Sequence, residues 1–209
     1  MDGLLFDTET LYRDALFTAA AEGGHVMTDA VFGRLLGCPW TVNRASLLAH
    51  YGADFPVDAV RAAWLGHFGR LAATDLRLKP GAAELLDTLD ALGIPRAIAT
   101  SSFRESAAHH LAAHGLAGRF AHVVAHGDYA RSKPAPDPFL AAAERLGVPP
   151  AACLALEDSH NGVRSAAAAG MMTVMVPDLL PPTDEMRALC VAIAPDLHHV
   201  RSLVLAAAP

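Results

Sequence analysis

Apolar residues in the first third of the chain recur at helical spacing, and no alternation typical of a strand interrupts them. The stretch from Leu11 to Ala21 contains no proline and is predicted to be a helix. Three or four further helical stretches, rich in Ala and Leu, follow before Leu76. Turn-forming residues separate these stretches at Gly23-Gly24, at Gly37-Cys38-Pro39 and from Gly52 to Pro56. We therefore predict an all-helical insert over residues 10–76.

From Lys79 onward the pattern changes to helices that alternate with short apolar strands. The predicted strands are 96–100, 122–125, 153–156 and 172–176, with a last one near Ile193. The predicted helices are 82–92, 105–114, 137–146 and 162–169, with a last one that begins near Thr183. This alternation is typical of right-handed β-α-β units, in which helices cover both faces of a parallel sheet. The sequence thus predicts an α/β core that comprises residues 1–9 and 77–209.

The composition is that of a globular chain, since 53% of the 209 residues are hydrophobic and 18% are charged. The net charge of −6 argues against a general nucleic-acid binder, which needs a clustered basic face. The longest apolar run, Ala166 to Val176, is too short for a membrane span, and the N-terminus lacks the features of a signal peptide. His110 and His114 are interpreted as part of a solvated helix face. We predict a cytoplasmic protein that binds neither nucleic acid nor a membrane.

Acidic residues stand at two places where they could bind a ligand or a cation. Asp2 precedes Gly3 in a turn that lets a carboxylate and the backbone approach a ligand, although Asp-Gly is also common in disordered termini. Glu157 and Asp158 end an apolar run, where two charges are unfavourable unless a cation compensates them. Mg²⁺ suits such a pair, because it binds a few carboxylates and keeps several waters. A solvated loop is the alternative for the pair.

Two further stretches suit a phosphate group. Lys133 precedes Pro134 and Pro136, whose fixed φ angles stiffen the loop and hold the ammonium in place. Thr100 and Ser101 follow a strand and open a helix, where a hydroxyl and free N–H groups favour an anion. The alternatives are a solvent-facing lysine and a simple helix N-cap.

Ligands of open α/β sheets bind at the carboxyl ends of the strands. Thr100, Asp128, Glu157 and Asp158 all lie at or just beyond such ends. We therefore expect these side chains to converge on one crevice.

Four stretches of the chain, in order, complete a family pattern. They are Asp2-Gly3, then Ala97 to Ser102, then Ser132 to Pro138, then Leu154 to Gly162. Together they resemble the four motifs of the haloacid dehalogenase-like superfamily, in the subgroup of β-phosphoglucomutase-like and phosphoglycolate phosphatase-like enzymes. The resemblance spans nearly the whole chain. It implies a Rossmann-like core with a small helical cap inserted after the first motif.

The resemblance also implies a function, namely a Mg²⁺-dependent phosphatase that hydrolyses a small phosphorylated metabolite through an aspartyl phosphate. The site residues that it implies are Asp2, Thr100 and Lys133 for catalysis, Thr100, Ser101 and Lys133 for phosphate, Asp2, Glu157 and Asp158 for the metal, and Trp40 and Arg44 for substrate choice in the cap. Trp40 stands where β-phosphoglucomutases have an arginine, which argues against a mutase. We also expect a monomer or a weak dimer.

Two other functions stay open, a sugar-phosphate mutase and a non-catalytic phosphate-binding protein. In the family the first motif reads Asp-x-Asp-Gly after an apolar strand, and Met1 stands at the position x. By resemblance, that strand lies between the strands that end at Thr100 and at Leu156. We therefore expect a short apolar strand, ending in the nucleophilic Asp, to precede Met1. If Met1 is the true start, the non-catalytic function is favoured.

Overall fold

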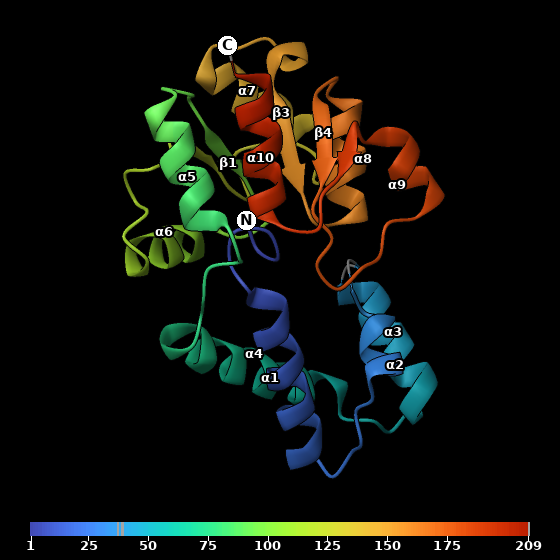
Figure 1. The fold of residues 1–209 in the computed structure, drawn as a ribbon. Helices are drawn as coiled ribbons and strands as arrows, with labels where there is room; N and C mark the ends of the chain where they lie inside the picture. Colours follow the sequence, from blue (N-terminus) through green and yellow to red (C-terminus); the bar gives the residue numbers. More distant parts are fainter. Residues whose placement is uncertain (37, 39, 209) are drawn as a thin grey trace. The chain divides into compact units, whose positions relative to one another are not determined.

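The computed structural model describes residues 1–36, 38 and 40–208. The chain divides into two compact units, each with its own apolar core. One unit joins Met1–Leu5 to the chain from Leu78 onward, and the other is Phe6–Arg77 (Figure 1). The role of residues 10–76 as a substrate cap stays a prediction.

The described residues of the Phe6–Arg77 unit form four helices (Figure 1). These are α1 (Thr8–Glu22), α2 (Asp29–Gly33), α3 (Trp40–Tyr51) and α4 (Val57–Thr74). Helices α1 and α4 pack together, and the indole N–H of Trp64 donates to the carbonyl of Tyr12 at 2.8 Å. The aliphatic and aromatic core of the unit includes Leu16, Phe32 and Leu47, which are almost fully buried. The apolar residues that recur at helical spacing in the sequence are thus those on the side of each helix that faces this core.

The turns of this unit lie where the sequence places its helix breakers. Gly23-Gly24 follows α1, and the stretch from Gly52 to Pro56 separates α3 from α4. Of the third predicted separator, Gly37-Cys38-Pro39, Gly37 and Pro39 lie outside the described residues.

The strands of the α/β unit pair in parallel and, within the described residues, form two sheets. β1 (Ala97–Ala99) pairs with β2 (His122–Val124). β3 (Leu154–Glu157), β4 (Met172–Met175) and β5 (Ala192–Ile193) form the other sheet in that order. The predicted α/β class with a parallel sheet is confirmed, because each strand follows a helix that returns the chain to the same end of the sheet.

The helices of this unit are α5 (Ala82–Ala91), α6 (Arg104–Ala113), α7 (Asp137–Leu146), α8 (His160–Ala168), α9 (Asp184–Leu189) and α10 (Leu197–Ala207), with a 3-10 turn at Pro150–Ala152. Helix α7 packs on β1 and β2, α8 packs on β3 and β4, and α5 packs against α10. The prediction from sequence did not include α10. Its signal was present, since Leu197, Val200 and Val204 follow helical spacing and the Asp196 carboxylate accepts from the backbone N–H of His199 at 2.8 Å.

A cavity of about 500 Å³ lies between β1 and β3. Both strands line it, together with Leu85 and Leu86 of α5 and Ala142 and Ala143 of α7. Among the strands of the described residues, β1 pairs with β2, and β3 pairs with β4. The further apolar strand that the family resemblance implies between β1 and β3 stays a prediction.

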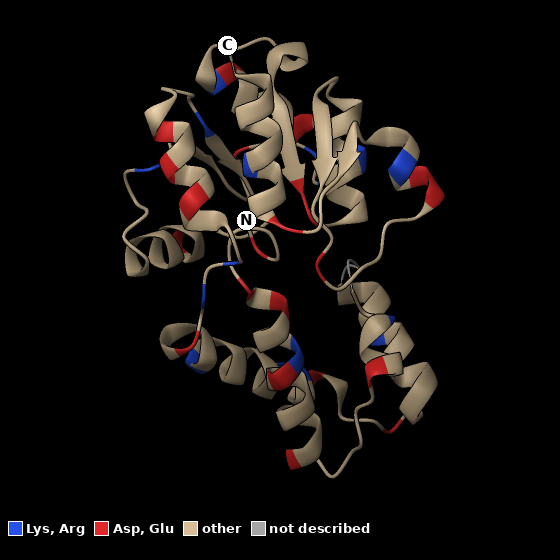
Figure 2. Ribbon diagram, viewed as in Figure 1, with Lys and Arg blue, Asp and Glu red and all other residues tan. Residues whose placement is uncertain are grey.

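None of the described helices combines the length and the apolar character that a membrane crossing requires. Figure 2 shows Lys and Arg positions interspersed with Asp and Glu positions in both units, with no basic stripe along the described ribbon. The cytoplasmic location, the lack of nucleic-acid and membrane partners, and the monomeric or weakly dimeric state stay predictions.

Candidate active site

The N-terminal turn brings the Asp2 carboxylate to the carboxyl end of β1. Gly3 has φ +69°, a value that favours glycine, and the N–H of Leu5 closes the turn on the carbonyl of Met1 at 2.8 Å. A Cβ on Gly3 would lie 2.5 Å from Asp158 Oδ2. The turn can therefore approach Asp158 only because position 3 has no side chain.

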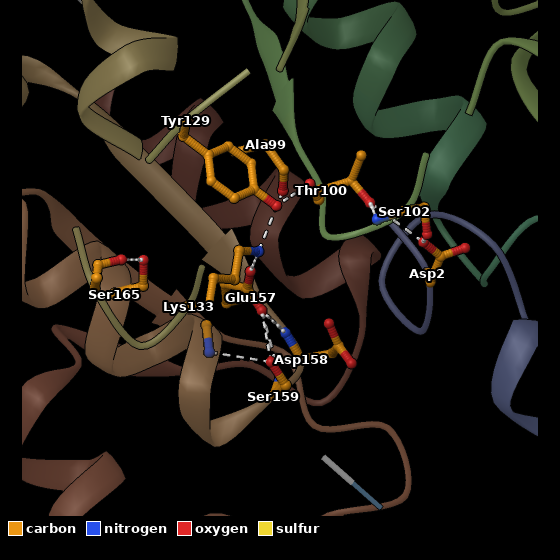
Figure 3. Close-up of polar contacts among 12 residues, drawn as sticks. Asp2, Ala99, Thr100, Ser102, Tyr129, Lys133, Glu157, Asp158, Ser159 and Ser165 are labelled. Atoms are coloured by element: carbon orange, nitrogen blue, oxygen red, sulfur yellow. Dashed lines mark hydrogen bonds and ion pairs between the residues drawn. The ribbon is translucent and has the colours of Figure 1, made fainter. Parts of the chain in front are cut away.

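Two hydroxyl groups after β1 hold the Asp2 carboxylate (Figure 3). Thr100 and Ser102 donate to Asp2 Oδ2 at 3.3 and 2.8 Å. The Thr100 hydroxyl also accepts from the backbone N–H of Ser102 at 3.1 Å, and Thr100 is buried. Tyr129 supports the same turn, because its hydroxyl donates to the Thr100 carbonyl at 3.1 Å. These contacts fix the direction in which the Asp2 carboxylate points.

A buried ion pair stands between the ends of β1 and β3 (Figure 3). The Lys133 ammonium pairs with Glu157 Oε1 and donates to the Ala99 carbonyl at 3.2 Å. The two side chains are only 11% and 4% exposed. Glu157 Oε2 accepts from the backbone N–H of Asp158 at 3.2 Å and from the Ser159 hydroxyl at 3.2 Å. Both oxygens of this buried carboxylate are therefore satisfied.

The first turn of α8 is shaped around Glu157. Ser159 caps the helix, since its hydroxyl accepts from the N–H of Gly162 at 3.1 Å. A Cβ on Gly162 would overlap the Glu157 carboxylate. The sequence Glu-Asp-Ser-x-x-Gly thus has a local reason, because the serine closes the helix end and the glycine leaves room for the buried acid.

The two adjacent acids have opposite electrostatic environments. Burial by itself would raise the pKa of Glu157. The positive charge of the Lys133 ammonium has a larger effect together with the hydrogen bonds to the carboxylate, so the pKa lies below its ordinary value. Loss of hydration, together with the charge of Glu157, raises the pKa of Asp158 to about 8. At neutral pH the protein therefore holds Glu157 ionised, whereas Asp158 keeps a proton unless a cation replaces it.

This arrangement fits a hard divalent ion that needs few protein ligands. Among the described residues, no three His, Cys, Asp or Glu side chains form a metal-binding group. Mg²⁺ does not require one, because it keeps several waters and binds one or two carboxylates plus a substrate phosphate. The raised pKa of Asp158 is the observation that fits, since a cation would offset the unfavourable ionisation. Asp158 is the better placed of the two, because the oxygens of Glu157 already accept other hydrogen bonds.

The sequence predicts that Ser101 acts beside Thr100, but the serine hydroxyl that contacts Asp2 in the structure belongs to Ser102. Ser101 is exposed, whereas Ser102 donates to Asp2. The tight turn after β1 sends the side chains of successive residues in different directions, and sequence spacing alone does not fix which one faces the carboxylate. A phosphate role for Ser101 stays a prediction.

Asp128 has a structural environment at the end of β2. Its carboxylate accepts from the backbone N–H of Ala125 at 2.9 Å and pairs with Arg104 and Arg145. The backbone N–H and the two guanidinium groups lower the pKa of Asp128 to about 2. The contacts of Asp128 thus fix the loop after β2, and its convergence with Thr100, Glu157 and Asp158 stays a prediction.

His110 of α6 was interpreted as solvated, and this interpretation is wrong. The residue is 7% exposed, and its burial lowers the pKa of the imidazole, while the charge of Asp2 acts in the opposite direction. A signal was present in the sequence, because His110 lies beside Leu111 and one turn after Ala107, both of which are buried.

The two predicted substrate residues belong to the Phe6–Arg77 unit. Trp40 begins α3, and the Arg61 guanidinium lies over its ring at 4.5 Å from the centroid. Arg44 pairs with Asp58 at 3.5 Å, and both of these side chains are exposed. Their roles in substrate choice stay predictions.

Comparison with known proteins identifies the family of the chain. Residues 1–170 match the haloacid dehalogenase-like hydrolases. The chain is 40% identical over 195 residues to protein CbbY of Cupriavidus necator, with 85% of this chain and 76% of CbbY covered. It is 36% identical over 185 residues to a probable pseudouridine-5'-phosphatase of Drosophila melanogaster, with 85% and 79% covered. The structure of a putative β-phosphoglucomutase from Thermotoga maritima superposes with a TM-score of 0.84 at 26% identity, covering 99% and 96%.

Proposed function

The chain belongs to the haloacid dehalogenase-like hydrolases and is a phosphoric monoester hydrolase, and from that premise we propose a Mg²⁺-dependent phosphatase for a small phosphorylated metabolite. The observation that carries the proposal is the meeting of Asp2, Thr100, Lys133 and Asp158 at the carboxyl ends of β1 and β3. Lys133 links the two strand ends, since it contacts the carbonyl of Ala99 and the carboxylate of Glu157. Open α/β sheets bind their ligands at such ends.

Each side chain has a proposed role. Lys133 and Thr100 hold the phosphoryl oxygens, and the ammonium offsets the charge that develops on them. Asp2 gives a proton to the leaving oxygen as the P–O bond breaks, and later takes a proton from the attacking water. The covalent step needs a carboxylate nucleophile, for which we propose an Asp directly before Met1. Ser102 keeps Asp2 in position for both proton transfers, because the single hydroxyl hydrogen of Thr100, which donates to Asp2 in the free protein, would serve the phosphoryl group when substrate binds.

The metal is proposed to bind at Asp158, with the Asp2 turn alongside. Bound Mg²⁺ would neutralise charge on the phosphoryl group and orient it. Glu157 contributes indirectly, because its carboxylate fixes Lys133 and the first turn of α8. The proposed direct carboxylate ligand is thus Asp158. The other two acids predicted at the metal, Asp2 and Glu157, lie next to it.

A sugar-phosphate mutase is the second candidate, and the similarity to the putative β-phosphoglucomutase favours it. A mutase transfers the phosphoryl group between positions of one sugar, so a sugar bisphosphate should restore its activity. A phosphatase instead releases inorganic phosphate whether or not bisphosphate is present. The position of Trp40, where the mutases have an arginine, favours the phosphatase.

The test is a screen of phosphorylated metabolites with the native protein, in which released phosphate is measured with Mg²⁺ and after exhaustive chelation. We expect phosphate release that chelation abolishes and Mg²⁺ restores. Full activity after chelation would refute the metal assignment. Phosphate binding without turnover on any substrate would favour a non-catalytic phosphate-binding protein.

A further inference from the structure

A further buried carboxylate, outside the four sequence motifs, lies beside the proposed metal position. Asp178 follows β4, and its side chain is only 9% exposed. Its Oδ1 accepts from the Lys79 ammonium at 2.7 Å. Its Oδ2 is buried and has no hydrogen-bond partner among the described residues. A buried, charged oxygen without a partner is costly, so this atom calls for an explanation.

The Oδ2 atom of Asp178 lies close to the backbone of Gly3 in the N-terminal turn. A Cβ on Gly3 would lie 3.2 Å from Asp178 Oδ2 and 2.5 Å from Asp158 Oδ2. The two carboxylate oxygens therefore approach the same side of the Gly3 backbone. The segments after β3 and β4 are also tied together, because the N–H of Val176 donates to the carbonyl of Glu157 at 2.7 Å.

The ion pair with Lys79 does not explain why the Oδ2 atom of Asp178 is buried without a hydrogen-bond partner in the described part of the chain. It uses one oxygen of Asp178 and holds the carboxylate so that the other oxygen lies on the side of Asp158. A cation with its bound water would compensate the charge of two carboxylates that approach each other in a partly desolvated region, and the water would supply the missing hydrogen bond.

We propose that Asp178 is a positioning residue of the metal site, whose Oδ2 accepts a hydrogen bond from a water on the divalent ion held by Asp158. Lys79 fixes the orientation of the carboxylate through Oδ1. This inference rests on the proposed metal-dependent function. Partners of this kind orient the ligands of a metal, and their loss typically weakens metal binding by about 10–100-fold.

The experiment measures Mn²⁺ affinity of the native protein by electron paramagnetic resonance, with Mg²⁺ competition. Asp178→Asn keeps the shape of the side chain and should weaken Mn²⁺ binding by about 10–100-fold. Asp158→Asn should abolish it. Asp184→Asn is the matched control, because it removes one negative charge at an exposed position of α9 and should leave the affinity unchanged.

A second variant separates metal positioning from a purely structural role. Lys79→Met breaks the same ion pair but keeps the Asp178 carboxylate, so thermal stability should fall as in Asp178→Asn while Mn²⁺ affinity stays closer to wild type. Equal weakening of Mn²⁺ binding in both variants, or wild-type affinity in Asp178→Asn, would overturn the inference. Absence of Mn²⁺ and Mg²⁺ binding to the wild type would instead overturn the proposed metal dependence itself.

Discussion

Replacing Lys133 by Met tests whether the buried ion pair keeps Glu157 charged. Met has a similar length and no charge, so the variant leaves the Glu157 carboxylate in a site where it is 4% exposed. Removal of one partner of a buried pair typically costs about 3–5 kcal/mol of unfolding free energy. That loss is a large part of the ~5–15 kcal/mol available to a typical domain.

The loss should depend on pH in a defined direction. In the wild type the pKa of Glu157 is depressed, so the pair stabilises the fold above the unfolded pKa of about 4.3, and this contribution is lost as pH falls through the folded pKa. In the variant, burial is no longer offset by Lys133, and the pKa of Glu157 should rise. The difference between the two proteins should therefore be smaller near about pH 4 than near neutral pH.

The assay is urea unfolding of both proteins at about pH 4 and about pH 7, with unfolding free energies from linear extrapolation. Lys133→Met combined with Glu157→Gln should recover most of the loss at neutral pH, because no buried charge remains. Arg131→Met is the matched control in the same loop. Its pair with Asp137 is exposed, so the unfolding free energy should hardly change. A loss of the same size at both pH values would refute the reasoning.

Three further predictions follow from the same site and its sheet. Because the pKa of Asp158 is raised to about 8, the unfolding free energy without metal should fall as pH rises from about 4 to about 8, and Asp158→Asn should remove this slope in a pH series of urea titrations. Gly162→Ala should destabilise the fold by about 1–3 kcal/mol in urea, because the added Cβ overlaps Glu157, whereas Gly69→Ala in α4 meets open space and should be neutral or stabilising. An extended apolar peptide of roughly five residues, the length of a typical strand, should raise the melting temperature by filling the cavity between β1 and β3. An unchanged melting temperature would argue against a strand there.

The sequence by itself determined the class of the fold and most of its elements. The α/β alternation follows from local periodicity, and helix ends such as Gly147, with φ +69° after α7, follow from local backbone preferences. The strand ends at Thr100 and Glu157 were also readable, because each apolar run stops at a polar residue. These signals are local, so a single sequence carries them.

Only the tertiary structure decided which polar residues meet. Ser102 rather than Ser101 contacts Asp2, Asp128 is held by two arginines, and Asp178 lies beside the turn of Gly3 although 175 positions separate them in the printed chain. Parallel strands bring distant segments to one edge, and the distance between two carboxylates there depends on side-chain direction and packing. Burial then sets whether each acid is ionised, as the opposite pKa shifts of two adjacent residues show. Sequence spacing encodes neither the direction of a side chain nor its hydration, and both are properties of the folded site.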